Sequence, residues 1–287
     1  MADTVRIRNS STARSAAALI ALVVCLSVAP AAASPVVVYL DVPYRVVDGV
    51  VLTLDVYVPA GGKGLPGVLV LHGGAWKDGD KIDWVEEGET LAAEGFVAYV
   101  ANYRLAPPGG TWHAIAPVQD LRAAVRWVRA NALLYGTDRT KVGILGASAG
   151  GNIAMMAGTT GEAGRGRADA VVSWSGSTQL RLAETEGTQS NRTNYVGCDL
   201  ETCPAEWDAA SPYFHVDGGA APTYIANSTD EIVSVEEAIT MADALTGVGV
   251  PNQLRILEGT RHARAYEDDV WEESMAFLHL YLDGGQR

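Results

Sequence analysis

Six short apolar runs alternate along the chain with stretches of helical character, and this alternation constrains the fold more than any other feature of the sequence. The apolar runs cover residues 68–71, 96–100, 142–145, 171–174, 223–226 and 253–257, and the helix-like stretches cover residues 117–132, 152–157, 235–245 and 266–282. Short apolar strands separated by helices are typical of a mostly parallel sheet that is buried on both faces. The sequence therefore predicts an α/β fold whose central sheet carries helices on both sides.

Residues 36–58 precede this pattern and show a different one. Alternation and β-branched residues predict strands at 36–40, 44–47 and 50–58, with Asp48 and Gly49 as a hairpin turn between the last two. Antiparallel strands should therefore open the domain. No internal repeat and no long linker divides residues 34–287, so a single domain is expected. The polar residues 179–193 form either a small lid or a plain solvated loop.

The first 33 residues have the composition of a secretory signal peptide. Arg6, Arg8 and Arg14 precede an apolar run at residues 16–28, and a cluster of small residues follows it. The run is shorter than the roughly 20 residues that a membrane-spanning helix needs. We therefore predict a secreted or periplasmic protein that is not inserted stably in a membrane once the signal is removed. A retained N-terminal anchor is the alternative.

The charge of the chain gives no reason to expect nucleic acid as a partner. The 21 basic and 34 acidic side chains give a net charge of −13. Three arginines and one aspartate lie in residues 1–33, so residues 34–287 keep 18 basic and 33 acidic side chains, a net charge of −15. Polyanions bind basic surfaces, and none is expected here. The sequence does not predict the oligomeric state.

Ser148 lies in the sequence Gly146-Ala147-Ser148-Ala149-Gly150, between a predicted buried strand and a predicted helix. A strand, a sharp turn and a helix are the context of a nucleophile elbow, in which small flanking residues permit the tight turn. The five-residue pattern alone occurs by chance in a sequence this rich in glycine, so the preceding strand carries the argument. We predict an α/β-hydrolase fold with Ser148 as its nucleophile.

Two adjacent glycines, Gly73 and Gly74, follow the predicted strand at residues 68–71. Unencumbered backbone N–H groups can hold the negative charge that develops on a carbonyl oxygen during acyl transfer. The N–H of Ala149, at the start of the helix after the nucleophile, would add a donor that gains from the helix dipole. We predict that Gly73, Gly74 and Ala149 form an oxyanion hole. A plain tight turn at the glycines is the alternative.

A serine hydroxyl needs a general base at neutral pH, and histidine has the pKa for that role. Of the five histidines, His262 directly follows the last predicted strand, at the sheet edge where ligands bind in parallel sheets. His72 is expected to order the glycine turn, His279 lies in a predicted helix, and His113 and His215 lie in loops. We therefore predict His262 as the base.

The acid that orients this base should follow a different strand and lie between Ser148 and His262 in the sequence. Asp230 and Glu231 both meet these conditions, and adjacent side chains cannot point the same way. We predict Asp230, because the apolar pair that follows it resembles the usual acid loop. Glu231 is the alternative.

Cys198 and Cys203 are the only cysteines in residues 34–287. An exported chain meets oxidising conditions, so we predict that they pair in a disulfide that closes a short loop. Two free thiols are the alternative. Zinc is not expected, because two cysteines without a nearby pair of histidines fall short of four ligands.

With these residues placed, the chain resembles bacterial esterases of the α/β-hydrolase superfamily that carry a His-Gly-Gly-x-Trp motif. It looks most similar to the feruloyl and acetyl esterase-like branch, which is related to kynurenine formamidase and to the hormone-sensitive-lipase group of carboxylesterases. The segments that carry the resemblance are residues 72–76, 102–107, 118–127, 146–152, 198–203 and 210–212. Two positions depart from the family pattern. Ala75 replaces the third glycine of the lipase-type oxyanion hole, and Asn227 stands where the segment before the acid often has glycine.

The resemblance implies that the chain is a serine carboxylesterase. Its substrate would be a small or short-acyl ester, hydrolysed through an acyl-enzyme by Ser148, Asp230 and His262. Neither a metal nor an organic cofactor is implied.

Two other functions fit part of the sequence. A peptidase of the prolyl-oligopeptidase kind has a similar elbow, but those enzymes usually add a propeller domain, and no blade repeat is visible. A non-catalytic binding protein of the same fold usually lacks a member of the triad, and all three candidates are present here. Acyl and alcohol specificity stay open. Four tryptophans are candidates for the pocket wall and equally for the core: Trp76, Trp84, Trp112 and Trp207.

Overall fold

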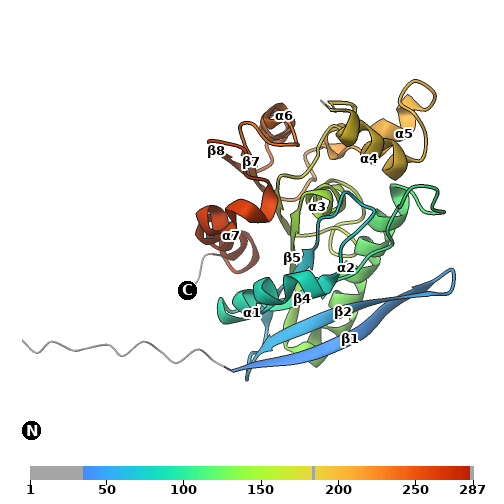
Figure 1. Cartoon of the computed structure of the whole chain (residues 1–287). Coiled ribbons are helices and arrows are strands. Elements are labelled where there is room, and N and C mark those ends of the chain that lie inside the picture. The colour runs from blue at the N-terminus through green and yellow to red at the C-terminus, as the bar shows by residue number, and fades with distance from the viewer. Residues whose placement is uncertain (1–34, 183–184, 285–287) are drawn as a thin grey trace, which may run out of the picture. The chain divides into compact units, whose positions relative to one another are not determined.

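The computed structural model describes residues 35–182 and 185–284, and Figure 1 shows the arrangement of its elements. The predicted signal peptide, residues 1–33, lies outside the described residues and stays a prediction. The strands are β1 (Val36–Val47), β2 (Val50–Pro59), β3 (Leu65–Leu71), β4 (Val97–Ala101), β5 (Thr137–Ala147), β6 (Ala170–Trp174), β7 (Thr223–Ser228) and β8 (Asn252–Leu257). They form one eight-stranded sheet in the order β1-β2-β4-β3-β5-β6-β7-β8.

The pairing of these strands confirms the predicted fold class. β1 and β2 pair antiparallel, as do β2 and β4, and every later pair is parallel. In β4, β6 and β7 every residue is buried, because helices cover both faces of the sheet. The six short apolar runs in the sequence correspond to strands β3 to β8.

The strand register brings the segments that follow the central strands to one edge of the sheet. Leu71 at the end of β3 is level with Gly146 in β5, and Ala147 is level with Trp174 at the end of β6. Trp174 in turn pairs with Ala226 in β7, next to the strand β8. Residues that directly follow β3, β5, β6, β7 and β8 therefore meet at the carboxyl edge, where ligands bind in such sheets.

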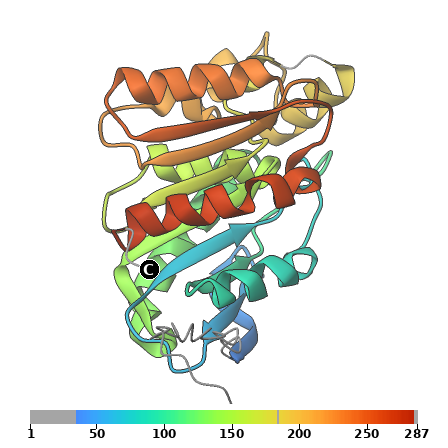
Figure 2. The ribbon, with the colours of Figure 1, turned by 90° about the vertical axis from the view of Figure 1, so that its left-hand side faces the viewer.

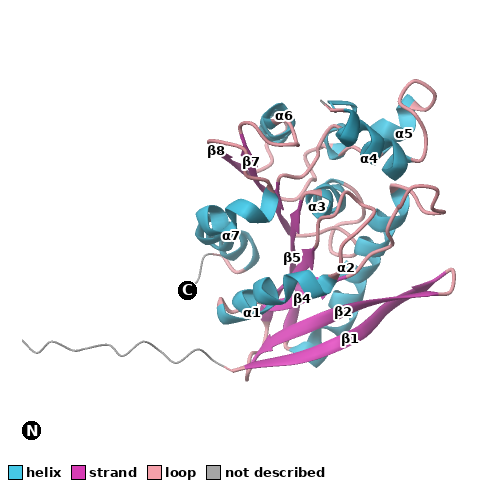
Figure 3. Cartoon of the chain, in the orientation of Figure 1, coloured by secondary structure: helices cyan, strands magenta, loops and turns pink. Residues whose placement is uncertain are grey.

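Two helical layers pack on this sheet, as Figure 3 shows in its colouring by secondary structure. The larger core cluster includes residues of α2 (Ile115–Tyr135), α3 (Ala149–Thr159) and α6 (Val235–Gly247). The other cluster includes residues of α1 (Val85–Ala93) and α7 (Glu267–Leu282), and Figure 2 shows these two helices in front of the sheet. Among the described residues, no helix has both the length and the apolar character needed to cross a membrane.

The N-terminal hairpin differs from the sequence prediction in one respect. Residues 36–47 form one strand rather than two, and Asp48 and Gly49 make the predicted turn before β2. The ladder between β1 and β2 shifts register on either side of residues 42–43. Asp41 has φ +53° there, and its N–H bonds a carboxylate oxygen of Asp55. A bulge of this kind interrupts the alternation of side chains, which explains the apparent gap between two strands.

The segment between β6 and β7 contains two helices, α4 (Glu186–Val196) and α5 (Pro204–Ala209). The sequence did not decide between a small lid and a solvated loop for residues 179–193 of this segment. Cys198 and Cys203, in the linker between these helices, form the predicted disulfide. Arg192 of α4 pairs with Glu237 of α6, and both side chains are buried. α4 is therefore anchored to α6 by a buried ion pair.

Candidate active site

Ser148 forms the turn between β5 and α3, with φ +54° and ψ −119°. Its N–H donates to the carbonyl oxygen of Trp174 at 2.7 Å, which fixes the turn against the end of β6. A Cβ on Gly150 would lie 2.5 Å from the carbonyl oxygen of His72, so only glycine allows α3 to begin so close to the end of β3. The strained turn leaves the Ser148 side chain at the carboxyl edge of the sheet, as predicted.

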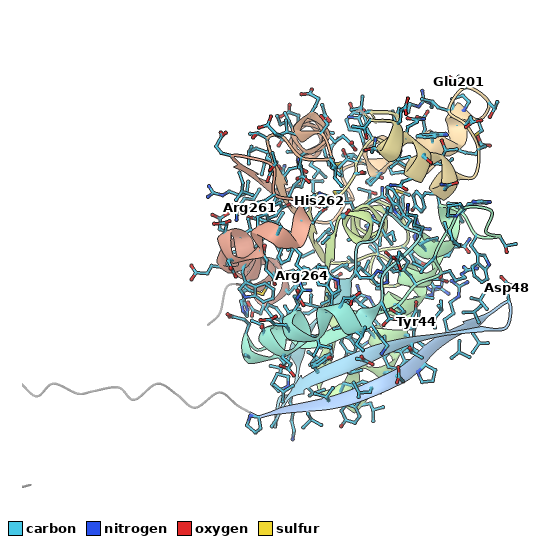
Figure 4. All side chains as sticks on the ribbon, in the orientation of Figure 1. Tyr44, Asp48, Glu201, Arg261, His262 and Arg264 are labelled. Atoms are coloured by element: carbon cyan, nitrogen blue, oxygen red, sulfur yellow. A yellow bond between two sulfur atoms is a disulfide. The ribbon has the colours of Figure 1, made fainter. Side chains whose placement is uncertain are left out.

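His262 lies in the base loop, which we define as residues 258–262, between β8 and α7 (Figure 4). Its Nε2 is 2.8 Å from Oγ of Ser148, and its Nδ1 contacts Oε2 of Glu231. An ionised carboxylate only accepts hydrogen bonds, so Nδ1 carries the ring proton and Nε2 is free to accept from the serine hydroxyl. The structure therefore brings the predicted nucleophile and the predicted base together.

The prediction that Asp230 is the acid partner of His262 is wrong. The Asp230 N–H donates to the carbonyl oxygen of Gly259, and its exposed carboxylate accepts from Thr229. Glu231 points inward instead, and its side chain is completely buried against the base. The acid loop, residues 229–234, turns back from the end of β7, and the longer side chain of Glu231 spans the distance to His262. The path of the backbone after β7, which the sequence does not show, decides which of these two adjacent carboxylates contacts His262.

The glycine loop, residues 72–79, passes directly beside Ser148. A Cβ on Gly73 would lie 3.2 Å from Cβ of Ser148, and Gly74 has φ +110°, where glycine is favoured. Within residues 35–182 and 185–284, no protein acceptor bonds the N–H of Gly73 or of Gly74. Ala149 is the first residue of α3, so its N–H has no acceptor inside the helix. The N–H groups of these three residues are therefore free of protein acceptors, and Gly73 and Ala149 lie next to Ser148.

Aromatic rings hold the glycine loop in place. Trp76 stacks on Tyr195 of α4, with ring centroids 4.3 Å apart and planes 9° from parallel. Trp76 Nε1 also donates to Asn152 Oδ1 at 3.2 Å. His72 stacks on Tyr103, whose hydroxyl donates to the His72 carbonyl oxygen at 2.9 Å. Burial lowers the pKa of His72, so its ring is neutral and orders the loop, in agreement with the role expected from sequence.

A cleft of about 580 Å³ opens in front of Ser148 and His262. Its walls comprise residues 72–75, 77–79, 83–84, 147–148, 232 and 262–264. Of the four candidate aromatics, only Trp84 lines this cleft. Trp76 and Trp207 are buried in the core, and Trp112 lines a separate pocket of about 310 Å³ beside α2. Among the described residues, no group of His, Cys, Asp and Glu side chains is arranged to hold a metal ion.

Two residues behind Glu231 were not singled out from the sequence. Ser175 follows β6 directly, and Tyr266 ends the short 3₁₀ turn Ala263–Tyr266 before α7. The Ser175 hydroxyl contacts both Glu231 and Tyr266. The sequence offers one signal for Ser175, which is its position directly after a buried strand, at the carboxyl edge of the sheet.

The sheet order, the elbow and the Ser148–His262 contact define an α/β-hydrolase fold. A thermophilic esterase of the Planctomycetes species Thermogutta terrifontis, Est2, has a similar structure, with a TM-score of 0.68 and 26% sequence identity over 85% of this chain and 89% of that chain. A truncated carbohydrate esterase from gut microbiota, 22% identical with a TM-score of 0.70, shares the fold over 86% of this chain and 99% of that chain.

The particular family follows from the sequence itself. The BD-FAE family model matches residues 54–245, and the chain belongs to this family. Esterase LipC of Mycobacterium tuberculosis (strain ATCC 25618 / H37Rv) is 28% identical over 208 residues, which are 65% of this chain and 49% of LipC. Carboxylesterase NlhH of the same strain is 39% identical over 98 residues, 32% of this chain and 28% of NlhH. The chain thus matches about half of LipC and a smaller part of NlhH.

Proposed function

We propose that this protein hydrolyses carboxylic esters with Ser148, His262 and Glu231 as its catalytic triad. The observation that carries the proposal is the continuous contact from Ser148 Oγ to His262 Nε2, at 2.8 Å, and from His262 Nδ1 to the buried Glu231 carboxylate. Nucleophile, base and acid in this order are the arrangement that acyl transfer requires. The esterase names of the relatives and of the Thermogutta structure support the same activity.

The reaction has two steps. His262 takes the proton of Ser148 as Oγ attacks the ester carbonyl, and the imidazolium then gives this proton to the departing alcohol, leaving an acyl-serine. In the second step a water loses its proton to His262, attacks the acyl carbon, and releases the carboxylic acid as the proton returns to Ser148. Glu231 stabilises the imidazolium in both steps. The N–H groups of Gly73, Gly74 and Ala149 would hold the oxyanion.

The acyl group is proposed to be short. The Thermogutta esterase was solved with propionate bound and with butyrate bound, and these structures are 26% and 25% identical to this chain. p-Nitrophenyl esters from acetate to decanoate would measure this preference. A maximum of kcat/KM at eight carbons or more would contradict it.

The Ser148→Ala variant tests the proposed reaction. We expect kcat for p-nitrophenyl butyrate to fall by about 10⁶, and labelling of the protein by a fluorophosphonate probe to be lost. A variant that hydrolyses the ester at the wild-type rate would refute the mechanism. If the wild-type protein takes the probe but cleaves a proline-containing peptide faster than any ester, the peptidase function is correct instead.

We further propose that the chain is exported and that its leader, residues 1–33, is removed. The disulfide between Cys198 and Cys203 supports an oxidising destination. Expression of the full chain in a bacterial host, followed by N-terminal sequencing of the periplasmic fraction, should yield a product that begins near Ser34. Recovery of the intact chain in the membrane fraction would favour the retained anchor.

A further inference from the structure

Ser175 lies at the junction of the acid loop and the base loop. Its side chain is fully buried, and its backbone has φ +50°. Its Oγ is 2.7 Å from Oε1 of Glu231, 2.7 Å from the hydroxyl of Tyr266, and 2.8 Å from the backbone N of Ala263. A serine gains nothing from this backbone conformation, which favours glycine. The role of the position therefore lies in the hydroxyl.

The chemistry of the partners assigns the hydrogen bonds at this hydroxyl. The Ala263 N–H can only donate, and the ionised Glu231 carboxylate can only accept. The Ser175 hydroxyl therefore gives its proton to Glu231 and accepts from Ala263. Burial raises the pKa of Tyr266 well above its ordinary value, so the phenol keeps its proton and donates to Ser175 or to the Ala226 carbonyl oxygen at 2.9 Å. The Ser175 hydroxyl thus donates one hydrogen bond, to Glu231, and accepts at least one, from Ala263.

These contacts decide which oxygen of Glu231 faces the base. Oε1 accepts both the Ser175 hydroxyl and the Ser228 N–H, the latter at 2.9 Å, so only Oε2 is left for Nδ1 of His262. Ser175 also bonds Ala263, the residue directly after the base, which has φ +51°. One hydroxyl therefore fixes both the rotation of the acid and the backbone next to the base.

We propose that Ser175 is a positioning residue for ester hydrolysis, holding the Glu231 carboxylate toward His262 and fixing the base loop at Ala263. The proposal rests on the proposed function, because Ser175 acts on the reaction only through these two groups. It lies behind the acid and is not part of the described cleft wall, so substrate does not touch it. Loss of the hydroxyl should therefore lower kcat and leave KM nearly unchanged.

The Ser175→Gly variant removes the hydroxyl and keeps a backbone that suits φ +50°. Since an orienting donor is lost and a buried N–H is left without its partner, we expect kcat for p-nitrophenyl butyrate to fall about ten- to a hundredfold. KM should stay within about twofold of wild type, because uniform substrate binding is not affected. Ser175→Ala gives the same comparison if the glycine variant does not fold.

Ser173→Ala is the matched control. Ser173 lies two residues earlier in β6, is equally buried, and its Oγ has no hydrogen-bond partner among the described residues. Its replacement removes a buried serine hydroxyl from the strand that directly precedes Ser175, without touching Glu231. We expect kcat and KM of this variant to equal those of wild type. A loss as large as that of Ser175→Gly would show that any change in β6 disturbs the site, and would overturn the proposal.

A double-mutant cycle with Glu231→Gln separates the two proposals. If Ser175 acts through Glu231, Ser175→Gly should lower kcat much less in the Glu231→Gln background than in the wild type. An equal loss in both backgrounds, or a normal kcat for Ser175→Gly while Glu231→Gln is impaired, would overturn the positioning role and leave the triad intact. A normal kcat for Glu231→Gln would refute the triad, and the role of Ser175 with it.

Discussion

Two sides of the cleft hold their groups by different physical means. The glycine loop presents backbone N–H groups, and stacked rings fix it, with Trp76 against Tyr195 and His72 against Tyr103. The acid and base loops present side chains, and a network of buried hydrogen bonds fixes them through Ser175 and Ser228. Backbone donors need only a loop in the right place, whereas a carboxylate and an imidazole must also be rotated correctly. Directional hydrogen bonds are therefore found on the side where the rotation of the carboxylate and of the imidazole must be fixed.

The sharpest test of the acid–base side compares two adjacent carboxylates. Glu231→Gln keeps the shape of the side chain and removes the charge that stabilises the imidazolium, so kcat should fall by about 10³ to 10⁴. Asp230→Asn makes the same chemical change at an exposed neighbour, and kcat should stay within about twofold of wild type. Ester hydrolysis by both variants across pH 6 to 9 checks this. A larger loss for Asp230→Asn would restore the assignment made from sequence.

On the side of the glycine loop, Gly74 is the residue with the least space for a side chain. A Cβ there would lie 2.0 Å from the Asp78 carbonyl oxygen, so Gly74→Ala must move the loop that carries the proposed oxyanion donors. We expect kcat to fall by about 10² to 10³, the usual effect of losing one such donor.

Gly95→Ala is the control for Gly74→Ala. Gly95 follows α1, has φ +95°, and nothing would lie within 4 Å of its Cβ, so the control shares the backbone strain without the collision. Gly95→Ala should lose about 1 kcal/mol of unfolding free energy through backbone strain alone, and Gly74→Ala should lose more because of the added collision. Only Gly74→Ala should lose activity, and equal activity in the two would show that the loop does not take part in catalysis.

The contrast between the two sides also explains what the sequence could predict. The buried strands and the elbow were predictable, because a sheet covered on both faces needs continuous apolar runs, as in residues 142–145 and 171–174. His262 was predictable from its place after the last strand. The acid was not, because the choice between Asp230 and Glu231 depends on the path of the backbone after β7. The glycine loop was predictable from two adjacent glycines directly after a predicted strand, since its proposed role requires only bare backbone.

Helices without an apolar stripe were missed for a related reason. α4 reads Glu-Gly-Thr-Gln-Ser-Asn-Arg-Thr-Asn-Tyr-Val, which is polar through most of its length. It is attached by the buried pair Arg192–Glu237 and by the stacking of Tyr195, both of which are long-range contacts. Hydrophobic periodicity does not detect a helix that is fixed by such contacts. α1 was missed for a different reason, because it is only nine residues long and contains Gly88, where a Cβ would lie 2.7 Å from the Tyr57 ring.

The stacked pair on the glycine-loop side offers a smaller and more selective test. Tyr195→Leu removes the ring on which Trp76 lies, and kcat should fall about three- to tenfold, the rate equivalent of an aromatic pair. Tyr195→Phe keeps the stack and removes only the bond from the hydroxyl to the Ala114 carbonyl oxygen at 3.2 Å, so its kcat should be close to wild type. Equal kcat in the two variants would mean that the stack does not hold the glycine loop.

The two sides should make stability depend on pH in opposite directions. Burial lowers the pKa of His72 on the aromatic side, so the contribution of His72 to the unfolding free energy rises with pH, and a carboxylate cluster beside the base loop does the reverse. Beyond His262, Arg264 pairs with Glu87 and with Glu267 at the start of α7, and Glu86 lies at 3.9 Å. Burial and repulsion from Glu87 raise the pKa of Glu267 from 4.5 to about 7. Between these values the folded protein binds more protons than the unfolded chain, so the unfolding free energy falls as pH rises through this window.

Glu267→Gln removes this titration and keeps a hydrogen-bonding side chain beside Arg264. The variant should be more stable than wild type at pH 8 by about 1 to 2 kcal/mol, less than the full pKa shift gives, because solvent partly screens the cluster. At pH 4 the two proteins should be nearly equal. Urea unfolding at each pH unit from 4 to 8 measures the difference, with the exposed Glu272→Gln in the same helix as the control. Parallel stability curves for Glu267→Gln and wild type would show that Glu267 is already ionised below pH 5, and that Arg264 neutralises both carboxylates of the cluster.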